Sequence, residues 1–220
     1  MARSITPFIG RREVAVGLSA AAAALVVPLP GGLAQSGLVA TPQQTTGPFY
    51  PVDWTGDADH DLVRVKGEAA RAMGEVVHVR GRVLGMAGQP LGGAAVEIWQ
   101  CDAEGVYRHP RDETGGRSHD AAFQGRGRTT TDAQGRYGFR TIRPVPYGWR
   151  TPHIHFKVEP ADRATLITQM YVFGEPRNER DGLLNSIRDR RQRDSVIVRL
   201  EPADGIEAGA LAAQFDIVIA

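Results

Sequence analysis

Two histidines stand two positions apart in an apolar stretch of the sequence, with a tyrosine and an arginine shortly before them. They are His153 and His155, preceded by Tyr147 and Arg150. Residues i and i+2 of a β-strand point to one face of the sheet, so a strand here would place both imidazoles side by side. A neutral imidazole is a good ligand for Zn, Cu, Fe or Ni, and the hard phenolate of a nearby tyrosine favours a high-valent ion such as ferric iron. The local pattern predicts a metal site, and a structural histidine pair is the alternative that it leaves open.

Tyr107 is a further candidate, in the polar loop 102–109 that follows the apolar run Val96–Gln100. A tyrosine in such a loop is usually a surface or packing residue, so its local context alone does not make it a ligand. Any metal-binding role for Tyr107 therefore depends on the wider pattern of motifs.

Short strands separated by turn residues must position these side chains. Seven runs have strand-like length and apolar patterning: Val76–Leu84, Ala94–Gln100, Arg136–Arg140, His153–Val158, Leu166–Phe173, Ser195–Leu200 and Phe215–Ile219. The 26 glycines and 14 prolines supply turns between them, so the sequence predicts an all-β fold, a β-sandwich with long loops. One short helix is expected at 182–187 with Asp181 as its N-cap, and the charged run 188–193 is expected to be a solvated loop.

The chain divides into three segments. Residues 1–34 have the pattern of an export signal, because Arg11 and Arg12 precede an apolar stretch, 14–27, that is too short to span a membrane comfortably. The adjacent arginines resemble a twin-arginine signal, and a Sec signal or an uncleaved anchor is the alternative. Residues 35–75 are expected to form an extended N-terminal segment packing on the core, and residues 76–220 the β-sandwich. We expect export to the periplasm or the extracellular space, with no stable membrane span after signal removal.

The composition excludes some partners and bonds. The formal net charge is +1, so no strong positive field would attract nucleic acid. Cys101 is the only cysteine, so no intrachain disulfide can form. A homo-oligomer is left open by the composition.

Four ordered motifs give the chain a family resemblance. They are Val96–Gln100, Gly105–His109, Thr131–Pro144 and Pro146–Phe156. Together they resemble the intradiol ring-cleavage dioxygenases, most closely the compact protocatechuate 3,4-dioxygenase type, over about residues 41–200. The resemblance implies a non-haem Fe(III) enzyme that inserts O2 into a catechol-type aromatic diol. The ring would be cut between the two hydroxyl carbons, giving a cis,cis-muconate-type product.

The resemblance also implies roles for individual residues. The iron ligands of the family fall on Tyr107, Tyr147, His153 and His155. By analogy Tyr147 and His153 would be the axial pair, with Tyr107 and His155 equatorial. Tyr147 would in addition be catalytic, as the phenolate that leaves the metal and accepts a substrate proton.

Other matched positions would contact the substrate. Arg150 would stabilise negative charge that develops on the ring, and Gln169 would line the same pocket; both are expected to be catalytic and substrate-binding. Trp149, Gly47 and Pro48 resemble further pocket residues.

The substrate and two rival readings are left open by the sequence. Five residues separate Tyr147 from His153, fewer than in many relatives, so a loop that shapes their pocket is missing or replaced. The glycine-rich turns and strands also resemble prealbumin-like β-sandwich modules, which would make the protein a periplasmic binding module without catalysis. A third reading is a Cu or Zn site that uses only His153 and His155.

Overall fold

The computed structural model describes Met1 and residues 37–112 and 116–220. The predicted export signal lies outside the described residues, apart from Met1. None of the helices in the described part is long and apolar enough to cross a membrane.

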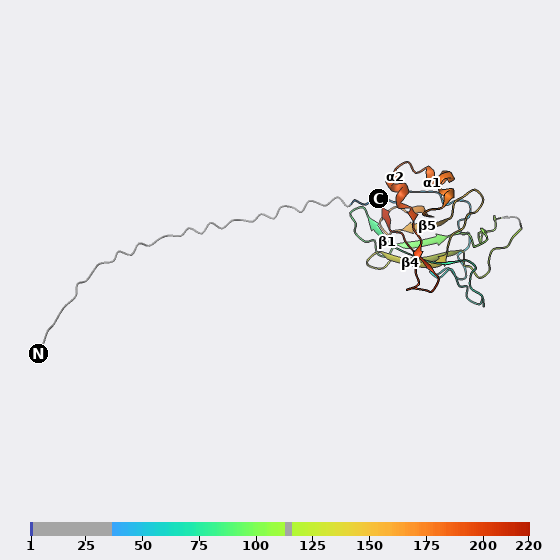
Figure 1. Cartoon of the computed structure of the whole chain (residues 1–220), viewed down its shortest axis with the longest axis horizontal. Coiled ribbons are helices and arrows are strands. Elements are labelled where there is room, and N and C mark those ends of the chain that lie inside the picture. Colours follow the sequence, from blue (N-terminus) through green and yellow to red (C-terminus); the bar gives the residue numbers. More distant parts are fainter. Residues whose placement is uncertain (2–36, 113–115) are drawn as a thin grey trace. The chain divides into compact units, whose positions relative to one another are not determined.

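Within the described residues, two five-stranded sheets carry the fold (Figure 1), three strands more than the seven that the sequence predicted. In the first sheet β1 pairs antiparallel with β4 and parallel with β9 and β10, while β8 pairs with β9. Its strands are β1 (Val76–Gly85), β4 (Arg136–Ile142), β8 (Glu201–Pro202), β9 (Leu211–Gln214) and β10 (Ile217–Ile219). The second sheet has the order β3 (Arg126–Thr130), β2 (Ala95–Trp99), β5 (His153–Glu159), β6 (Leu166–Val172) and β7 (Ile197–Val198). The all-β sandwich is confirmed.

Alternation along β5 decides where the candidate site lies. Ile154 and Phe156 are fully buried in the core between the sheets, and the Phe156 ring packs edge-on against Phe215 with 5.1 Å between centroids. Successive side chains of a strand point to opposite faces, so His153 and His155 point out of this core. They are nevertheless buried, because loops cover the outer face of the second sheet.

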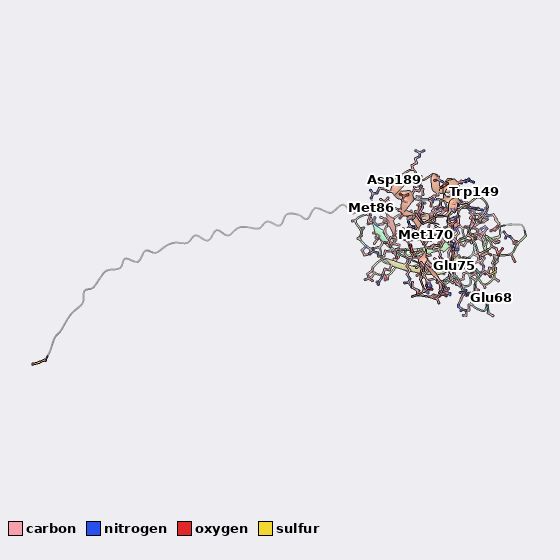
Figure 2. The ribbon with its side chains drawn as sticks, in the orientation of Figure 1. Glu68, Glu75, Met86, Trp149, Met170 and Asp189 are labelled. Carbon is pink, nitrogen blue, oxygen red and sulfur yellow. The ribbon has the colours of Figure 1, made fainter. Side chains whose placement is uncertain are left out.

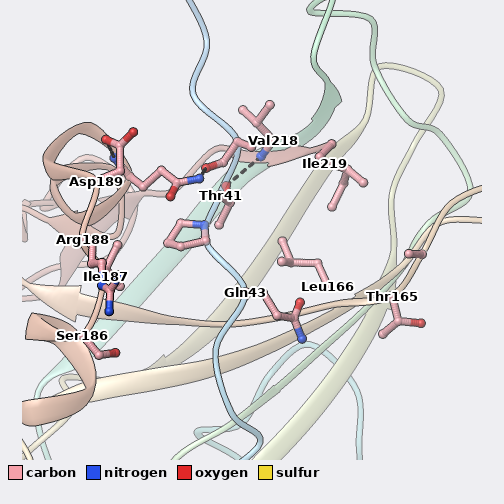
Figure 3. A pocket seen from close by; sticks show the side chains of 15 residues that line it. Thr41, Gln43, Thr165, Leu166, Ser186, Ile187, Arg188, Asp189, Val218 and Ile219 are labelled. Atoms are coloured by element: carbon pink, nitrogen blue, oxygen red, sulfur yellow. Dashed lines mark hydrogen bonds between the residues drawn. The ribbon is translucent and has the colours of Figure 1, made fainter.

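The described part of the N-terminal segment, residues 37–75, runs across the sandwich with little regular structure. Thr41 joins it to β10: its backbone N–H donates to the Val218 carbonyl at 2.9 Å, and its hydroxyl accepts from the Val218 N–H (Figure 3). Further along, the Gln44 N–H donates to the Ile167 carbonyl at 2.7 Å, beside β6. A hollow of about 620 Å³ lies between this segment, β10 and the residues that precede the last helix (Figure 3). The segment thereby reaches the outer face of the second sheet.

The helical region confirms one expectation and corrects two. Helix α1 (Gly182–Asn185) begins at Asp181, whose carboxylate accepts the Leu183 and Leu184 N–H groups, as predicted. The expected solvated loop at 188–193 is wrong, because α2 (Arg190–Ser195) forms there with the Asp189 carboxylate capping its first turn. The expected strand 195–200 shrinks to Ile197–Val198. A 3₁₀ helix, η1 (Pro176–Arg180), precedes α1, and α1 and α2 lie together on one side of the molecule (Figure 1).

Candidate metal centre

Strand β5 holds the two histidines in the middle of the second sheet. In the pairing register, His155 lies opposite Trp99 of β2 and Gln169 of β6, while His153 lies opposite Tyr171. Both imidazoles are about 1% exposed. A strand with hydrogen-bonded neighbours on both sides has little freedom, so the side-by-side placement expected from the i, i+2 spacing is rigid.

The two imidazoles point their Nε2 atoms at each other. His153 Nδ1 lies 2.6 Å from the Thr151 carbonyl oxygen and donates to it, which leaves a lone pair on Nε2. That Nε2 accepts from Nε2–H of His155 at 3.2 Å, and a cation bound between the rings would move this proton to His155 Nδ1, which is buried and has no partner in the described part of the chain. The Trp99 ring stacks on His155 at 4.7 Å and 7°, which fixes the plane of this imidazole.

Burial keeps both histidines neutral. It lowers the pKa of His153 to about 3, with the nearby Arg150 guanidinium adding to the effect. The pKa of His155 also lies well below its ordinary value, through burial first and then through His153 and Arg150. Neutral imidazoles keep the lone pairs that a metal ion needs, so protons do not compete for these nitrogens near neutral pH.

Two phenols close the ring of side chains around this nitrogen pair. The Tyr107 ring lies 5.0 Å from Tyr147 and 6.3 Å from His155, in both cases edge-on. The Tyr147 ring lies 5.6 Å from His153. The buried Tyr107 hydroxyl makes no hydrogen bond of ordinary geometry in the part of the chain that the structure describes, although the Tyr147 hydroxyl lies close enough to affect its pKa. A buried hydroxyl without a well-formed hydrogen bond is costly, and the donors around it suggest a cation as the partner for both phenols.

Burial raises the pKa of both phenols, so each is neutral in the protein alone. The effect is strong for Tyr107, and for Tyr147 it is opposed by the Arg150 guanidinium. A bound multivalent cation reverses this logic and favours the phenolate. Among the described residues no group of three or more His, Cys, Asp or Glu could hold a metal, so an ion between His153 and His155 would need the two phenols to complete its ligands.

Local turns present the two tyrosines. In the first loop the Asp102 carboxylate accepts the N–H groups of Glu104 and Val106, at 2.9 Å each, directly before Tyr107. In the second loop the Arg150 N–H donates to the Tyr147 carbonyl at 2.9 Å and closes a tight turn. Such bonds between a short polar side chain or a carbonyl and nearby N–H groups fix a loop locally.

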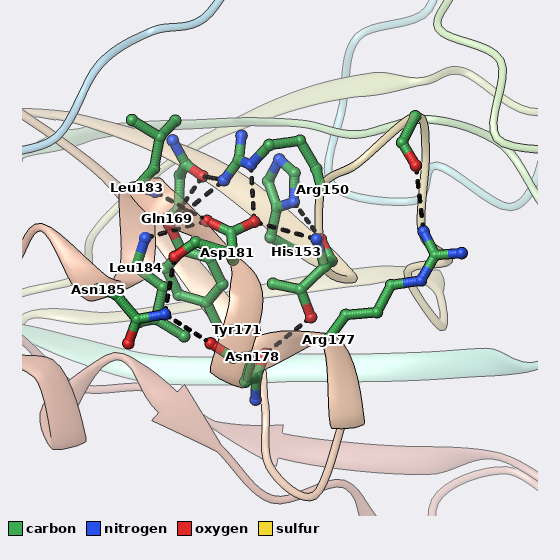
Figure 4. Close-up of polar contacts among 12 residues, drawn as sticks. Arg150, His153, Gln169, Tyr171, Arg177, Asn178, Asp181, Leu183, Leu184 and Asn185 are labelled. Atoms are coloured by element: carbon green, nitrogen blue, oxygen red, sulfur yellow. Dashed lines mark hydrogen bonds and ion pairs between the residues drawn. The ribbon is translucent and has the colours of Figure 1, made fainter.

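Arg150 is buried behind the ring cluster, and its partners hold it there. Its Nε donates to Asp181 Oδ2 at 2.8 Å and its Nη2 to Gln169 Oε1 at 2.6 Å (Figure 4). Asp181 Oδ2 also accepts from the Thr151 N–H, while Oδ1 caps helix α1. Burial works against ionisation of Asp181, but its bonds with Arg150, Leu184 and Thr151 outweigh it, so its pKa lies below the ordinary value.

Gln169 supports the arginine rather than lining the cleft. Its Oε1 accepts from Arg150 and, at 3.0 Å, from the Tyr171 hydroxyl. Its own N–H donates to Gln44 Oε1 at 3.0 Å, and its Nε2 donates to the Thr45 carbonyl at 3.3 Å. The N-terminal segment is thus bonded to the strand that positions Arg150.

A cleft of about 510 Å³ opens beside Tyr147 and brings together most of the expected substrate-contacting residues. Trp149 forms part of its wall and is 67% exposed, at the surface of the molecule (Figure 2). The full lining is Thr45, Gly47, Pro48, Phe49, Tyr147, Gly148, Trp149, Arg150 and Leu183. The structure therefore places Gly47, Pro48, Trp149 and Arg150 around one cleft, and Gln169 behind it.

Gly47 lies directly against the metal-binding candidates. Its φ is +71°, and a Cβ added to it would stand 3.3 Å from Cε1 of His155. A glycine is therefore favoured at this position both by its backbone conformation and by the close approach of the imidazole.

Several neighbours of the site were not predicted from the sequence. Phe49 stacks on Tyr107 with 4.8 Å between ring centroids, and Leu183 forms a wall of the cleft. Trp99, Tyr171 and Asp181 fix the rings and the arginine as described above. Trp99 and Tyr171 lie on strands adjacent to β5, so a correct strand pairing is the signal that would have found them.

The donor set fits ferric iron. Two neutral imidazoles and two phenols that a cation would deprotonate are a mixed N and O set, and hard anionic oxygens favour the ferric state. With the cleft beside Tyr147 open to solvent, a small molecule could reach an ion held there.

Comparison with known proteins finds relatives that match most of the chain. Residues 45–220 match the family model described as Dioxygenase (Dioxygenase_C). The protocatechuate 3,4-dioxygenase beta chain of Burkholderia cepacia is 38% identical over 184 residues, which cover 78% of this chain and 76% of that protein. The catechol 1,2-dioxygenase of Candida albicans is 33% identical over 130 residues, but the match spans only 39% of it.

Solved structures show the same fold. The dioxygenase domain of a dioxygenase carbohydrate-binding protein fusion from Streptomyces sp. SirexAA-E superposes with a TM-score of 0.61 at 31% identity, covering 82% of this chain and 98% of that one. An intradiol ring-cleavage dioxygenase from Tetranychus urticae gives a TM-score of 0.63 at 22% identity, a likeness of fold, covering 83% and 95% of the two chains. The family match sets aside the reading as a binding module without catalysis. On its sequence, its sandwich and its family match, the chain belongs to the intradiol ring-cleavage dioxygenases and is an enzyme of that family.

Proposed function

We propose that the protein is a non-haem Fe(III) dioxygenase that cleaves a catechol-type diol with O2 between its two hydroxyl carbons, giving a cis,cis-muconate-type product. The observation that carries this proposal is the pair of neutral imidazoles whose Nε2 atoms face each other 3.2 Å apart, with the buried Tyr107 phenol and the Tyr147 phenol beside them. Ferric iron bound there would supply Lewis acidity and a chelation point for both oxygens of the diol.

The residues around the cleft would divide the remaining tasks. Tyr147 lies at the boundary between the ring cluster and the cleft, so its phenolate can accept a proton from an incoming diol. Arg150 is held by Asp181 and Gln169, so its charge is preorganised toward the same cleft and can stabilise anionic character on the ring. Phe49 and Pro48 present an apolar wall that excludes water from one side of the bound ring.

The lining of the cleft favours a diol whose ring substituent is uncharged. Arg150 is the only cation among the nine lining residues, and it already bonds with Asp181 and Gln169. A substrate carboxylate would therefore find no free cation in the cleft, and burying it unpaired would be costly. Catechol should be turned over with a higher kcat/KM than its 4-carboxylate. The reverse order would contradict this part of the proposal.

Metal content, visible absorption and oxygen uptake test the proposal together. Protein from iron-replete cells should contain one iron per chain and show a tyrosinate-to-iron charge-transfer band, which anaerobic catechol should shift. Oxygen uptake with catechol should release a muconate-type diacid. A colourless preparation without iron would overturn the ferric site, and one that holds Cu or Zn in its place would favour the site built on His153 and His155 alone.

Export of the protein is part of the proposal. It rests on the adjacent arginines and the short apolar stretch of residues 1–34. Fractionation of cells that express the full chain tests it, because Arg11→Lys with Arg12→Lys should retain the protein in the cytoplasm if a twin-arginine signal is used.

A further inference from the structure

A second cavity lies on the far side of the Tyr107 loop and shares no lining residue with the cleft. It measures about 520 Å³ and is walled by the segment 52–56, the loop 108–110, His119 and strand β3. Four of its residues carry nitrogen donors, namely Arg108, His109, His119 and Arg126. Nothing in the proposed reaction uses them.

His109 contributes a buried donor that has no acceptor. Its Nδ1 accepts the Arg111 backbone N–H at 3.0 Å, so the proton of the neutral ring must sit on Nε2. That Nε2 is buried and has no hydrogen-bond partner in the described part of the chain, and the residue is 8% exposed. An unpaired buried N–H is uncommon in folded proteins and indicates a missing acceptor.

Arg126 contributes a buried guanidinium without a carboxylate. It is 5% exposed, and its hydrogen bond in the described part of the chain runs from Nη2 to the Thr55 carbonyl, at 2.7 Å. Its buried Nε has no partner there. A charge removed from water is expensive unless it is paired, so this arrangement is unfavourable while the cavity holds no anion.

The other charges in the cavity offset the Arg126 charge only in part. Arg108 is exposed at the cavity wall and forms no ion pair within the described residues. The pKa of Arg126 is lowered first by its burial and second by the positive charge of Arg108. Asp53 also lines the cavity and its charge favours the ionised form of Arg126, but it forms no ion pair with it, and its two oxygens accept from the Thr55 N–H and hydroxyl, at 2.8 Å each. The cavity therefore holds two guanidiniums against one carboxylate, which leaves one positive charge in excess.

We propose that this cavity is a binding site for a small oxyanion, with the Arg108 and Arg126 guanidiniums and His109 Nε2 as its donors. Carboxylate, sulfate and phosphate oxygens all match the donors, because guanidinium forms charge-assisted, often bidentate bonds with each of them. The anion would supply the acceptor that His109 and Arg126 lack. The site is separate from the proposed catalytic cleft and does not depend on iron or on the diol.

Calorimetric titration with sulfate, and in parallel with acetate, tests the site on the purified protein. Chloride keeps the ionic strength constant throughout, so that general screening does not mimic binding. The visible absorption band is recorded in the same samples, because an anion that binds the metal would change it. Sulfate reports a tetrahedral group and acetate a planar one.

Arg108→Gln and Arg126→Gln test the donors, and Arg128→Gln is the matched control. Arg128 lies on the same strand as Arg126 and equally 5.9 Å from the Trp54 ring, but it does not line the cavity. Saturable binding of at least one anion with an unchanged absorption band is expected. The two cavity variants should bind it about tenfold more weakly or worse, and Arg128→Gln should bind it like the wild type.

Three outcomes would overturn the site. The first is that neither anion binds saturably. The second is that Arg108→Gln, which changes an exposed side chain and should fold, binds as tightly as the wild type. The third is that Arg128→Gln loses as much affinity as the cavity variants, which would indicate only a diffuse attraction by surface charge.

Discussion

Each sheet carries a cluster of histidine and arginine, and the two clusters are built in opposite ways. On the first sheet, His78 Nε2 lies 2.9 Å from Glu207, and Arg140 pairs with both Glu207 and Asp61, at 2.7 and 3.0 Å. These side chains are partly exposed, between 13% and 33%. On the second sheet His153 and His155 are almost fully buried, and neither has a carboxylate partner in the described part of the chain.

The difference shows what makes an imidazole a ligand. An acidic partner at the surface gives His78 a structural role in an ion-pair network. Burial without an acid keeps His153 and His155 neutral, so that each imidazole can offer a nitrogen lone pair to a cation. Arg150 is the cation of the second cluster, and it pairs with the carboxylate of Asp181. That carboxylate is therefore not available as a partner for the imidazoles. The same residue types therefore give a surface brace in one sheet and a candidate metal site in the other.

Removing an imidazole from each cluster should give the largest contrast. We expect His155→Ala to lose the iron, the visible band and essentially all oxygen uptake with catechol, because it deletes one of the two facing nitrogens. His78→Ala should keep all three, since the first sheet takes no part in the site. Metal analysis and oxygen-electrode rates on both proteins make the comparison. Equal iron content in His155→Ala and His78→Ala would contradict the difference that we infer between the two clusters.

Removing a carboxylate from each cluster should give the next largest contrast. Asp181→Asn leaves the Arg150 guanidinium buried without its charge partner, which typically costs about 3–5 kcal/mol of stability. Glu207→Gln breaks partly exposed pairs and should cost about 1 kcal/mol or less. Urea unfolding of both variants measures these values, and oxygen uptake should fall only for Asp181→Asn. Similar losses of stability would show that burial does not separate the two arginines.

Acid should weaken the second cluster before the first in iron-free protein. An unfolded histidine binds a proton below about pH 6.5, while folded His153 stays neutral down to a pKa of about 3. The unfolded state then holds more protons, so stability falls as the pH drops through this window. Arg140 lowers the pKa of Glu207 to about 2, so its contribution is lost only below about pH 4.5.

Urea midpoints at pH 7, 5 and 3 test this order. The wild type should lose stability between pH 7 and 5, and His153→Phe should lose less over the same interval. The urea midpoint of Glu207→Gln should change with pH as that of the wild type does from pH 7 to 5, and should differ from it only between pH 5 and 3. A wild-type midpoint that is flat from pH 7 to 5 would contradict the buried, neutral state of the imidazoles.

A methyl group added beside His155 should give the smallest effect. Gly47→Ala strains a backbone with φ of +71° at a cost of about 1 kcal/mol and puts a Cβ 3.3 Å from the imidazole. Gly56→Ala is the matched control, because φ is +75° there but no atom lies within 4 Å of the added Cβ. Both should lose similar stability, and only Gly47→Ala should shift the visible band. Identical visible spectra for Gly47→Ala and Gly56→Ala would show that the N-terminal segment does not constrain the His155 imidazole.

The sequence was enough to predict which side chains lie together along one strand or at one helix end. It was not enough to predict contacts between distant segments. The side-by-side placement of His153 and His155 follows from a two-residue period, and the cap at Asp181 follows from its type and place before a helix. That Asp181 also binds Arg150 depends on a contact across 31 positions, which no local pattern encodes.

The missed elements have a similar physical cause. Strand β3 reads Arg-Gly-Arg-Thr-Thr and has no apolar alternation; it is a strand because it pairs with β2, for example Arg128 with Glu97. Helix α2 has no buried residue, so it gives no apolar periodicity, and the Asp189 cap is its only local signal. In both cases tertiary pairing or capping outweighed the pattern on which the prediction relied.

The parallel pairing of β1 with β9 and β10 has a consequence for how the protein folds. A hydrogen bond across this junction joins Arg82 to Asp216, which lies 134 positions later in the chain. Strands β2 and β6, the two neighbours of β5, lie within that span. The first sheet cannot close until the ribosome has released the residues of β10, whereas β2, β5 and β6 can pair earlier. Closing so large a loop is entropically demanding and kinetically slow. The strands that carry the candidate metal ligands can therefore pair first, and the ion pairs of the first sheet form afterwards, when the sandwich closes.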